Sequence, residues 1–151
     1  MKCSLVLLIV SVIIASTFGD PHDLPEYAEK RYHLEPFFKT NWFKAMQYCH
    51  SKGMRLITIA SKEEQRNIEN FARESDLGDE SFWTSGTSLG DQVFYWFDSG
   101  KKITFTNWIN GEPNDFDSDR KCIEILNETD FKWNDCSCFD NNKRVICEEN
   151  V

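Results

Sequence analysis

The sequence has few of the features that would place a protein in a membrane or on nucleic acid. Apart from one stretch near the N-terminus, its 151 residues contain no long apolar run, so no later segment is expected to span a bilayer. Lys and Arg number 17, against 25 Asp and Glu, which gives a formal charge of −8. This charge disfavours nucleic acid and anionic membrane surfaces as partners, because both are negative themselves.

Catalytic and zinc-binding patterns are also missing. The three histidines are scattered and form no ligand pair. The spacing in Cys136-Ser137-Cys138 is wrong for a zinc knuckle. The chain has no Ser/His/Asp, Cys/His or metal-hydrolase arrangement, so we do not expect an enzyme.

The one apolar run extends from Leu5 to Ala15, after the basic Lys2 and before the small residues Thr17 and Gly19. This order predicts a secretory signal peptide over residues 1–19, cleaved after Gly19. A membrane anchor is the alternative, but the run is too short to cross a bilayer comfortably. The protein is therefore expected to be secreted and extracellular.

The rest of the chain is expected to form a single α+β domain over residues 20–149, with 20–26 as a loose N-terminal tail. One helix is predicted within residues 40–53, capped by Thr40 or Asn41, and a second begins at the Ser61–Glu64 capping box. A loop-rich region over residues 84–119 carries tryptophans and a proline, which favours an ordered, functional loop. Strands are predicted at 31–38 (interrupted at its proline), 54–59, 82–86, 93–97, 103–105, 122–126, 131–133 and 145–148.

Cysteine content supports the extracellular location. One of the six cysteines lies in the signal peptide, and in a secreted chain the remaining five indicate disulfide bonds. Because five is odd, one thiol is either unpaired or joined to another molecule.

Two groups of oxygen-bearing side chains mark a candidate site. Glu112 and Asn114 flank Pro113, and Asn134 and Asp135 follow a tryptophan about twenty residues later. Carboxylate and amide oxygens are the ligands that hard cations such as Ca²⁺ prefer. A cation with open coordination positions can hold a further ligand directly, so these residues predict a joint metal and ligand site.

The motifs in this half of the chain, together with the first predicted helix, resemble a C-type lectin domain. The resemblance covers roughly residues 27–149 and implies a C-type lectin-like fold, with two helices, short antiparallel sheets and a long ligand-binding loop region. The form Trp-Thr-Ser-Gly-Thr at 83–87 is similar to secreted, single-domain insect members. The motifs that carry the resemblance are Trp42 to Cys49, Phe82 to Thr87, Phe94-Tyr95-Trp96, Asn107-Trp108, Gly111 to Asn114, Cys122, Trp133-Asn134-Asp135, Cys138 and Cys147-Glu148.

The resemblance also implies a disulfide pattern. Cys49 should pair with Cys147, and Cys122 should pair with Cys138. Cys136 is left over. Three fates are open to it: a partly buried free thiol, a rival partner for Cys122, or an interchain bridge that makes a dimer.

In the family, the Glu-Pro-Asn loop and the Trp-Asn-Asp strand bind one Ca²⁺, and sugar hydroxyls complete its coordination. The resemblance therefore implies that Glu112, Asn114, Asn134 and Asp135 are both metal ligands and carbohydrate-binding residues. Glu-Pro-Asn resembles the mannose-type motif, whereas the galactose type has Gln-Pro-Asp. The peptide bond before Pro113 is expected to be cis, as it is in the family.

One residue departs from the family pattern. Arg120 stands where the family places a Glu that binds the ion. At an effective dielectric constant near 20, two unit charges about 4 Å apart interact by roughly 4 kcal/mol, so a guanidinium there would oppose Ca²⁺. Either Asp119 serves as a substitute ligand while Arg120 points to solvent, or Arg120 pairs with Glu112 and Asp135 in place of the ion.

Two functions follow from the resemblance. The first is Ca²⁺-dependent recognition of mannose-type glycans, in innate immunity or cell-surface recognition. The second is a lectin-like factor, of a salivary or venom type, that binds a protein because its calcium and sugar site is degenerate. The partner is accordingly a glycan or a glycoprotein. Asn127-Glu128-Thr129 is an N-glycosylation sequon on a predicted turn, and it should lie away from the site.

Overall fold

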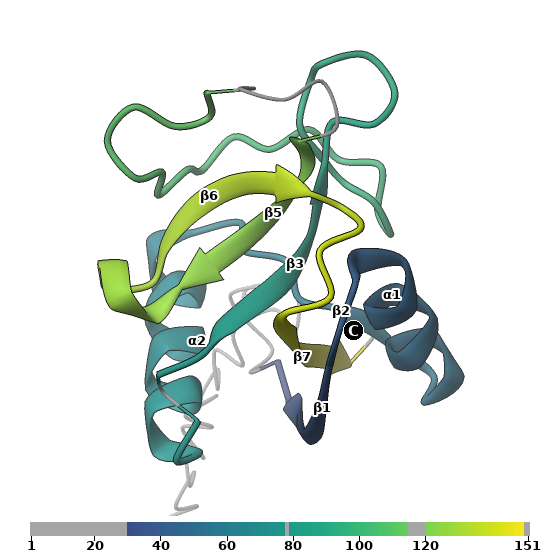
Figure 1. Cartoon of the computed structure of the whole chain (residues 1–151), viewed down its shortest axis with the longest axis vertical. Coiled ribbons are helices and arrows are strands. Elements are labelled where there is room, and N and C mark those ends of the chain that lie inside the picture. Colours follow the sequence, from purple (N-terminus) through teal and green to yellow (C-terminus); the bar gives the residue numbers. More distant parts are fainter. Residues whose placement is uncertain (1–29, 78, 115–119, 150–151) are drawn as a thin grey trace, which may run out of the picture.

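A computed structural model describes residues 30–77, 79–114 and 120–149 of the chain, with the side chains of Arg120 and Lys121 excepted. The predicted signal peptide and loose tail lie outside these residues. In the described residues, no helix is both long and apolar enough to cross a membrane. The elements, shown in Figure 1, are β1 (Tyr32–Thr40), α1 (Trp42–Ser51), β2 (Met54–Leu56), α2 (Lys62–Glu74), β3 (Ser81–Thr87), β4 (Tyr95–Trp96), β5 (Arg120–Leu126), the 3-10 helix η1 (Asn127–Thr129), β6 (Lys132–Ser137) and β7 (Lys143–Glu149).

The strands form a single sheet in the order β1-β7-β3-β5-β6, with β2 also paired to β7 and β4 paired to β3. The expectation of an α+β fold is confirmed. The expectation of several short antiparallel sheets needs correction, because β3 and β7 run parallel and join the strands into one mixed sheet. Figure 1 shows the long loops gathered at the upper end of β3 and β5, above both helices.

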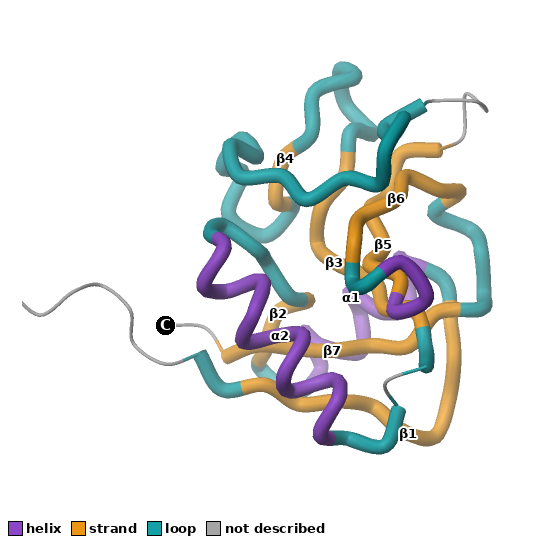
Figure 2. The backbone as a smooth tube through the Cα atoms, turned by 90° about the vertical axis from the view of Figure 1, so that its left-hand side faces the viewer, coloured by secondary structure: helices purple, strands orange, loops and turns teal. Residues whose placement is uncertain are grey.

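The two helices cover opposite faces of the sheet. In each strand, side chains alternate between the faces, so neighbouring residues enter different parts of the core. Phe82 packs with Ile68 of α2, whereas the next residue, Trp83, packs with Met46 of α1. In β7, Ile146 likewise joins the α2 side. Figure 2 shows α2 in front of the strands and α1 behind them.

Both helices begin at the predicted caps. Asn41 accepts a hydrogen bond from the backbone nitrogen of Lys44 at 3.0 Å, and Ser61 accepts from that of Glu64 at 3.1 Å. One detail of the capping box differs. The Glu64 carboxylate accepts from the backbone nitrogen of Ala60 at 2.6 Å, one residue before the cap, and so holds the entering chain instead of the cap itself.

Predicted strands and observed strands differ mainly at their ends. The predicted strand 54–59 pairs only as far as Leu56, because the backbone of Ile57 then hydrogen-bonds to Ser85 and Ile146 individually. β1 continues past Pro36 to Thr40, with a register shift against β7 between Glu35 and Thr40. Residues 103–105 form no strand and instead belong to the loops.

Tryptophans fill the core beneath the loops. Trp133 is fully buried, and the rings of Trp96, Phe105 and Trp108 meet it edge-on at centroid distances of 5.5–5.8 Å. Its indole nitrogen donates to Gln65 Oε1 of α2 at 2.8 Å. Trp108 is only partly buried and packs against this core from the loop side.

The disulfides join the pairs that the resemblance implies. Cys49 of α1 is bonded to Cys147 of β7, and Cys122 of β5 is bonded to Cys138 just after β6. The first links residues 98 positions apart, so it ties the beginning of the domain to its end. Cys136 is a free, buried cysteine.

Candidate functional site

The loop that carries Glu112 lies along β6. The backbone nitrogen of Trp133 donates to Asn107 O, and that of Ile109 donates to Trp133 O, each at 2.9 Å. A turn closed by the Glu112 nitrogen on Ile109 O at 3.0 Å then brings the chain to the Glu112–Pro113 bond, which is cis. Since β6 itself carries Asn134 and Asp135, this docking brings the two predicted halves of the site together.

Glu112, Asn114 and Asp135 meet at one backbone nitrogen. The Asn114 nitrogen lies 3.0 Å from Glu112 Oε2 and 3.2 Å from Asp135 Oδ1. The Asn114 side-chain nitrogen donates to the other Glu112 oxygen at 2.6 Å. Two carboxylates that share one donor repel each other, and a cation between them would relieve that repulsion.

Asp135 is almost fully buried, with 1% of its surface exposed. Its Oδ1 accepts from Asn114, but among the described side chains its Oδ2 has no hydrogen-bond partner. Burying a carboxylate oxygen without a partner is costly, and in proteins such atoms are normally satisfied by a donor or a metal ion. This oxygen is therefore the atom of the site most in need of a ligand.

Asn134 lies on the other face of the sheet. Neighbouring residues of a strand point to opposite sides, so Asn134 and Asp135 leave β6 in different directions. Asn134 sits directly opposite Glu124 in the ladder, and its amide nitrogen donates to Glu124 Oε1 at 2.9 Å. The structure thus brings Glu112, Asn114 and Asp135 together. The amide nitrogen of the fourth predicted residue, Asn134, instead points to Glu124.

Glu124 and Lys143 form a buried ion pair that the sequence analysis did not identify. Their side chains are 3% and 12% exposed, and Lys143 Nζ lies 2.9 Å from both Glu124 Oε2 and Asp140 Oδ2. Burial alone would lower the pKa of Lys143. The hydrogen bond to Asp140 and the charge of Glu124 outweigh burial and raise this pKa to about 12. The sequence does contain a signal for this neighbour of Asn134. If residues 122–126 are paired as a hairpin with the strand that follows the turn at 127–130, Glu124 falls opposite Asn134.

Cys136 lies beside this ion pair. Its side chain is buried, and burial together with the negative charge of Glu124 raises the pKa of the thiol well above its usual range, although Lys143 opposes this. Such a thiol is a poor nucleophile, since the thiolate is the reactive form. Cys136 is also the direct cross-strand partner of Cys122, whose sulfur is already bonded to Cys138.

The departure from the family pattern can be placed only by its backbone. Arg120 begins β5 opposite Ser137 of β6, next to the strand end that carries the site. Its side chain, and the whole of Asp119, lie outside the described residues. Neither of the two arrangements expected for Arg120 is therefore tested.

The oxygen atoms of Glu112, Asn114 and Asp135 are of the kind that a hard cation prefers, but they are few. Among residues 30–77, 79–114 and 120–149, no three His, Cys, Asp or Glu side chains are grouped to hold a metal. Two carboxylates and one amide do converge. Within the described part of the chain, the buried Asp135 Oδ2 also has no hydrogen-bond partner, so it is available to bind a cation. Amide oxygens also bind Ca²⁺, so Asn114 can add a ligand to the two carboxylates.

Comparison with known proteins gives a consistent family. The Lectin C-type domain family matches residues 38–149. C-type lectin mosGCTL-7 of Aedes aegypti is 30% identical over 128 residues, covering 78% of this chain and 85% of that protein. C-type lectin 37Db of Drosophila melanogaster is 31% identical over 138 residues, covering 90% and 87%.

Two solved structures have a similar fold but different described properties. The carbohydrate-recognition domain of cow CD23, determined in the presence of a GlcNAc2Man3 oligosaccharide, gives a TM-score of 0.69 at 26% identity, covering 81% of this chain and 88% of that one. A calcium-independent type II antifreeze protein gives a TM-score of 0.67 at 25% identity, covering 80% and 85%.

Proposed function

Because the chain belongs to the Lectin C-type domain family, a family of carbohydrate-binding domains, we propose that it recognises glycans of the mannose type with the help of Ca²⁺. The chain is not an enzyme: its relatives are lectins, which bind sugars without transforming them. The proposed site consists of Glu112, Asn114 and Asp135, with Asn134 as a further member.

The observation that carries the proposal is the pair of carboxylates at the Asn114 nitrogen. One oxygen of each carboxylate, Glu112 Oε2 and Asp135 Oδ1, lies within 3.2 Å of that one atom, and the other Asp135 oxygen is buried and has no hydrogen-bond partner among the described residues. A Ca²⁺ held here would supply a Lewis acid that polarises sugar hydroxyls, which otherwise compete poorly with water. Glu112 would then accept a hydrogen bond from one hydroxyl, and the Asn114 amide would donate to the next.

Asn134 leaves β6 on the face opposite to Asp135, so it would reach the same ion only through its amide oxygen. An amide that donates through its nitrogen still has an oxygen with two lone pairs, so the bond to Glu124 leaves a ligating atom. Glu124 would orient the Asn134 amide in the way that outer carboxylates orient metal ligands.

Retention on mannan resin tests the proposal. We expect the purified protein to be retained in Ca²⁺ and released by EDTA. The paired substitution Glu112→Gln and Asn114→Asp should move retention from mannan to galactose resin, because it converts the motif to the galactose type. Glu128→Gln, an exposed acid on η1, is the control and should leave retention on mannan unchanged. Retention that survives EDTA, or no retention on any sugar resin, would overturn the proposal.

A second candidate function rests on Arg120. A positive charge at the start of β5 would weaken the binding of Ca²⁺. A calcium-independent antifreeze protein has a similar fold, so the fold does not require the ion. The chain would then be a lectin-like factor that binds a protein partner. Loss of mannan retention together with specific binding to a glycosidase-treated protein would favour this function.

We place the protein outside the cell. The predicted signal peptide supports this location, as do the two disulfides, which persist in oxidising compartments.

Asn127 begins η1 at the far end of β5 from Arg120, a separation of about 20 Å for a strand of this length. A glycan on Asn127 would therefore leave the sugar site open.

The burial of Cys136 favours a free thiol over an interchain bridge.

A further inference from the structure

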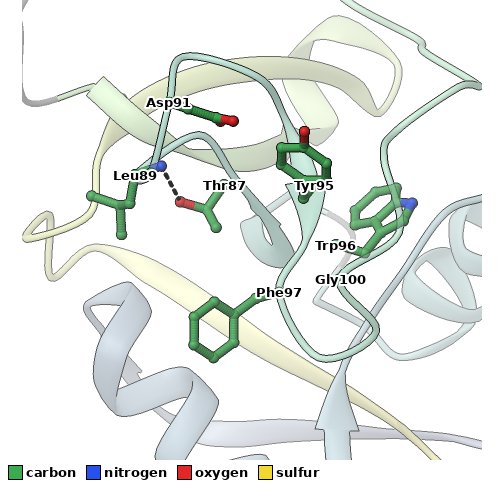
Figure 3. A pocket seen from close by; sticks show the side chains of 8 residues that line it. Thr87, Leu89, Asp91, Tyr95, Trp96, Phe97 and Gly100 are labelled. Atoms are coloured by element: carbon green, nitrogen blue, oxygen red, sulfur yellow. Dashed lines mark hydrogen bonds between the residues drawn. The ribbon is translucent and has the colours of Figure 1, made fainter.

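A pocket lies in the loop region and uses none of the residues assigned to the sugar site. Its volume is about 450 Å³, within the range of small-molecule sites. Figure 3 shows the Asp91 carboxylate and the Tyr95 hydroxyl on one side of it, with Phe97 on the other. The lining residues are Thr87, Leu89, Gly90, Asp91, Tyr95, Trp96, Phe97 and Gly100.

Two of the walls are large apolar side chains left in solvent. Leu89 is 49% exposed and Phe97 is 56% exposed. Apolar groups of this size are costly to expose when they stand together, and such groups commonly mark binding sites. The rings of Tyr95 and Trp96 extend the same lining, so most of the pocket surface is apolar or aromatic.

The Phe97 wall of the pocket is preformed, because it is fixed to the rest of the fold. The backbone nitrogen of Phe97 donates to Ser85 O at 2.9 Å, and the Phe97 ring packs edge-on against Trp42 at 5.4 Å. The next residue, Asp98, lies 2.6 Å from His50 of α1. A preformed site loses less conformational entropy on binding than a mobile one.

Charge selects the class of ligand. Of the eight described residues that line the pocket, Asp91 alone is charged. Its Oδ1 accepts from the Val93 nitrogen at 3.3 Å, which orients the carboxylate. Lys102, which pairs with Tyr95, is exposed and does not line the pocket. Aromatic faces also attract cations, so carboxylate and rings favour the same charge.

We propose that this pocket binds a small aromatic amine, with its ammonium group at Asp91 and its apolar body between Leu89, Tyr95 and Phe97. The site is separate from the proposed sugar site and needs neither Ca²⁺ nor a glycan. The protonated amine exchanges part of its hydration for the carboxylate, and the ring removes Leu89 and Phe97 from water.

Three probes that share one body test the proposal: 2-phenylethylamine, the neutral 2-phenylethanol and the anionic 3-phenylpropionate. Amide shifts of the ¹⁵N-labelled protein would be followed in EDTA, so that the sugar site is inactive. We expect shifts in the segment 87–100, with the amine binding about two- to five-fold more tightly than the alcohol, the range of a solvent-accessible ion pair. The carboxylate should bind most weakly.

Variants then separate charge from shape. Asp91→Asn should remove the preference for the amine while retaining the alcohol, and Phe97→Ala should weaken both. Glu74→Gln, an exposed acid at the end of α2, is the matched control and should change neither. Equal binding of amine and alcohol to the unaltered protein would overturn the proposal, as would shifts outside the segment 87–100. The same shifts produced by methyl α-mannoside would also overturn it, because the pocket would then be a sugar subsite.

Discussion

Asn134 and Glu124 face each other across the β5–β6 ladder, 2.9 Å from amide nitrogen to carboxylate oxygen. The neighbouring Asp135 lies on the opposite face, where its Oδ1 is 3.2 Å from the Asn114 nitrogen. The two residues of one motif therefore have different surroundings: Asn134 is already hydrogen-bonded to an acid of the sheet, whereas one Asp135 oxygen has no hydrogen-bond partner within the described part of the chain.

This difference predicts unequal effects on Ca²⁺ affinity. Asp135→Asn should lower the affinity by about ten-fold or more, because it removes a charge beside Glu112 in a buried setting. Asn134→Ala should lower it by a smaller factor, since it removes a neutral ligand. Calorimetric titration with CaCl₂ measures both, and a larger loss for Asn134→Ala would contradict the arrangement described.

Arg120→Glu should raise Ca²⁺ affinity. Reversing one charge at the start of β5 replaces repulsion by attraction, and at about 4 Å and a dielectric constant near 20 each such interaction is worth roughly 4 kcal/mol before desolvation. We expect at least a ten-fold gain, measured as tighter Ca²⁺ binding and a larger rise of Tm in Ca²⁺. Arg66→Glu on α2 is the control. No gain in the Arg120 variant would mean that this side chain points to solvent.

The Lys143 pair predicts a pH dependence at the alkaline end. The pKa of Lys143 is raised from 10.5 to about 12 in the folded protein, so the stabilisation is complete below pH 10 and is lost as the pH rises toward 12. The shift corresponds to roughly 2 kcal/mol. The difference in free energy of unfolding between wild type and Lys143→Met should therefore shrink between pH 10 and 12, as measured by urea denaturation.

The exposed Lys132→Met variant is the matched control for this measurement. It shares the chemistry of the substitution but not the buried partners Glu124 and Asp140. A difference for Lys143→Met that stays constant to pH 12 would show that the ion pair does not stabilise the fold.

Cys136 should be inert in the native protein. Its buried thiol has a raised pKa, and reactivity follows the thiolate fraction, which falls tenfold per pKa unit. At pH 8 we expect a thiol reagent to label native protein at least about 100-fold more slowly than unfolded protein. Non-reducing electrophoresis should show a monomer. Fast native labelling, or a dimer abolished by Cys136→Ser, would restore the interchain bridge as the explanation.

Local patterns in the sequence predict much of the scaffold. The helix caps at Asn41 and Ser61 lie at the expected positions, because capping depends on residues three apart in the chain. Tryptophans such as Trp83 and Trp133 are buried, as large aromatic side chains usually are. The parallel β3–β7 pairing was not predicted, since paired residues 62 positions apart, such as Phe82 and Arg144, leave no local signal of strand direction.

The site was predicted less completely than the scaffold. Glu112 and Asn114 stand out in the sequence because they flank a proline, and their loop brings them to Asp135. Glu124 had no such mark, being one acid among 25. Its role depends on the strand register and on Lys143, which approaches from a different strand. Long-range contacts of this kind are decided by the whole fold, and no window of the sequence contains them.

The pairing of β1 with β7 determines where a further segment can be joined to the domain without covering its sites. Tyr32 lies opposite Glu148, and Arg31 is bonded to Glu149 at 2.7 Å, so the chain enters and leaves the domain at one place. Figure 2 shows the two ends side by side, below the loops that carry the sugar site and the pocket. A tag, a carrier or a second domain joined at either end would therefore leave both sites facing the solution, and two such domains in tandem could present their sites in the same direction.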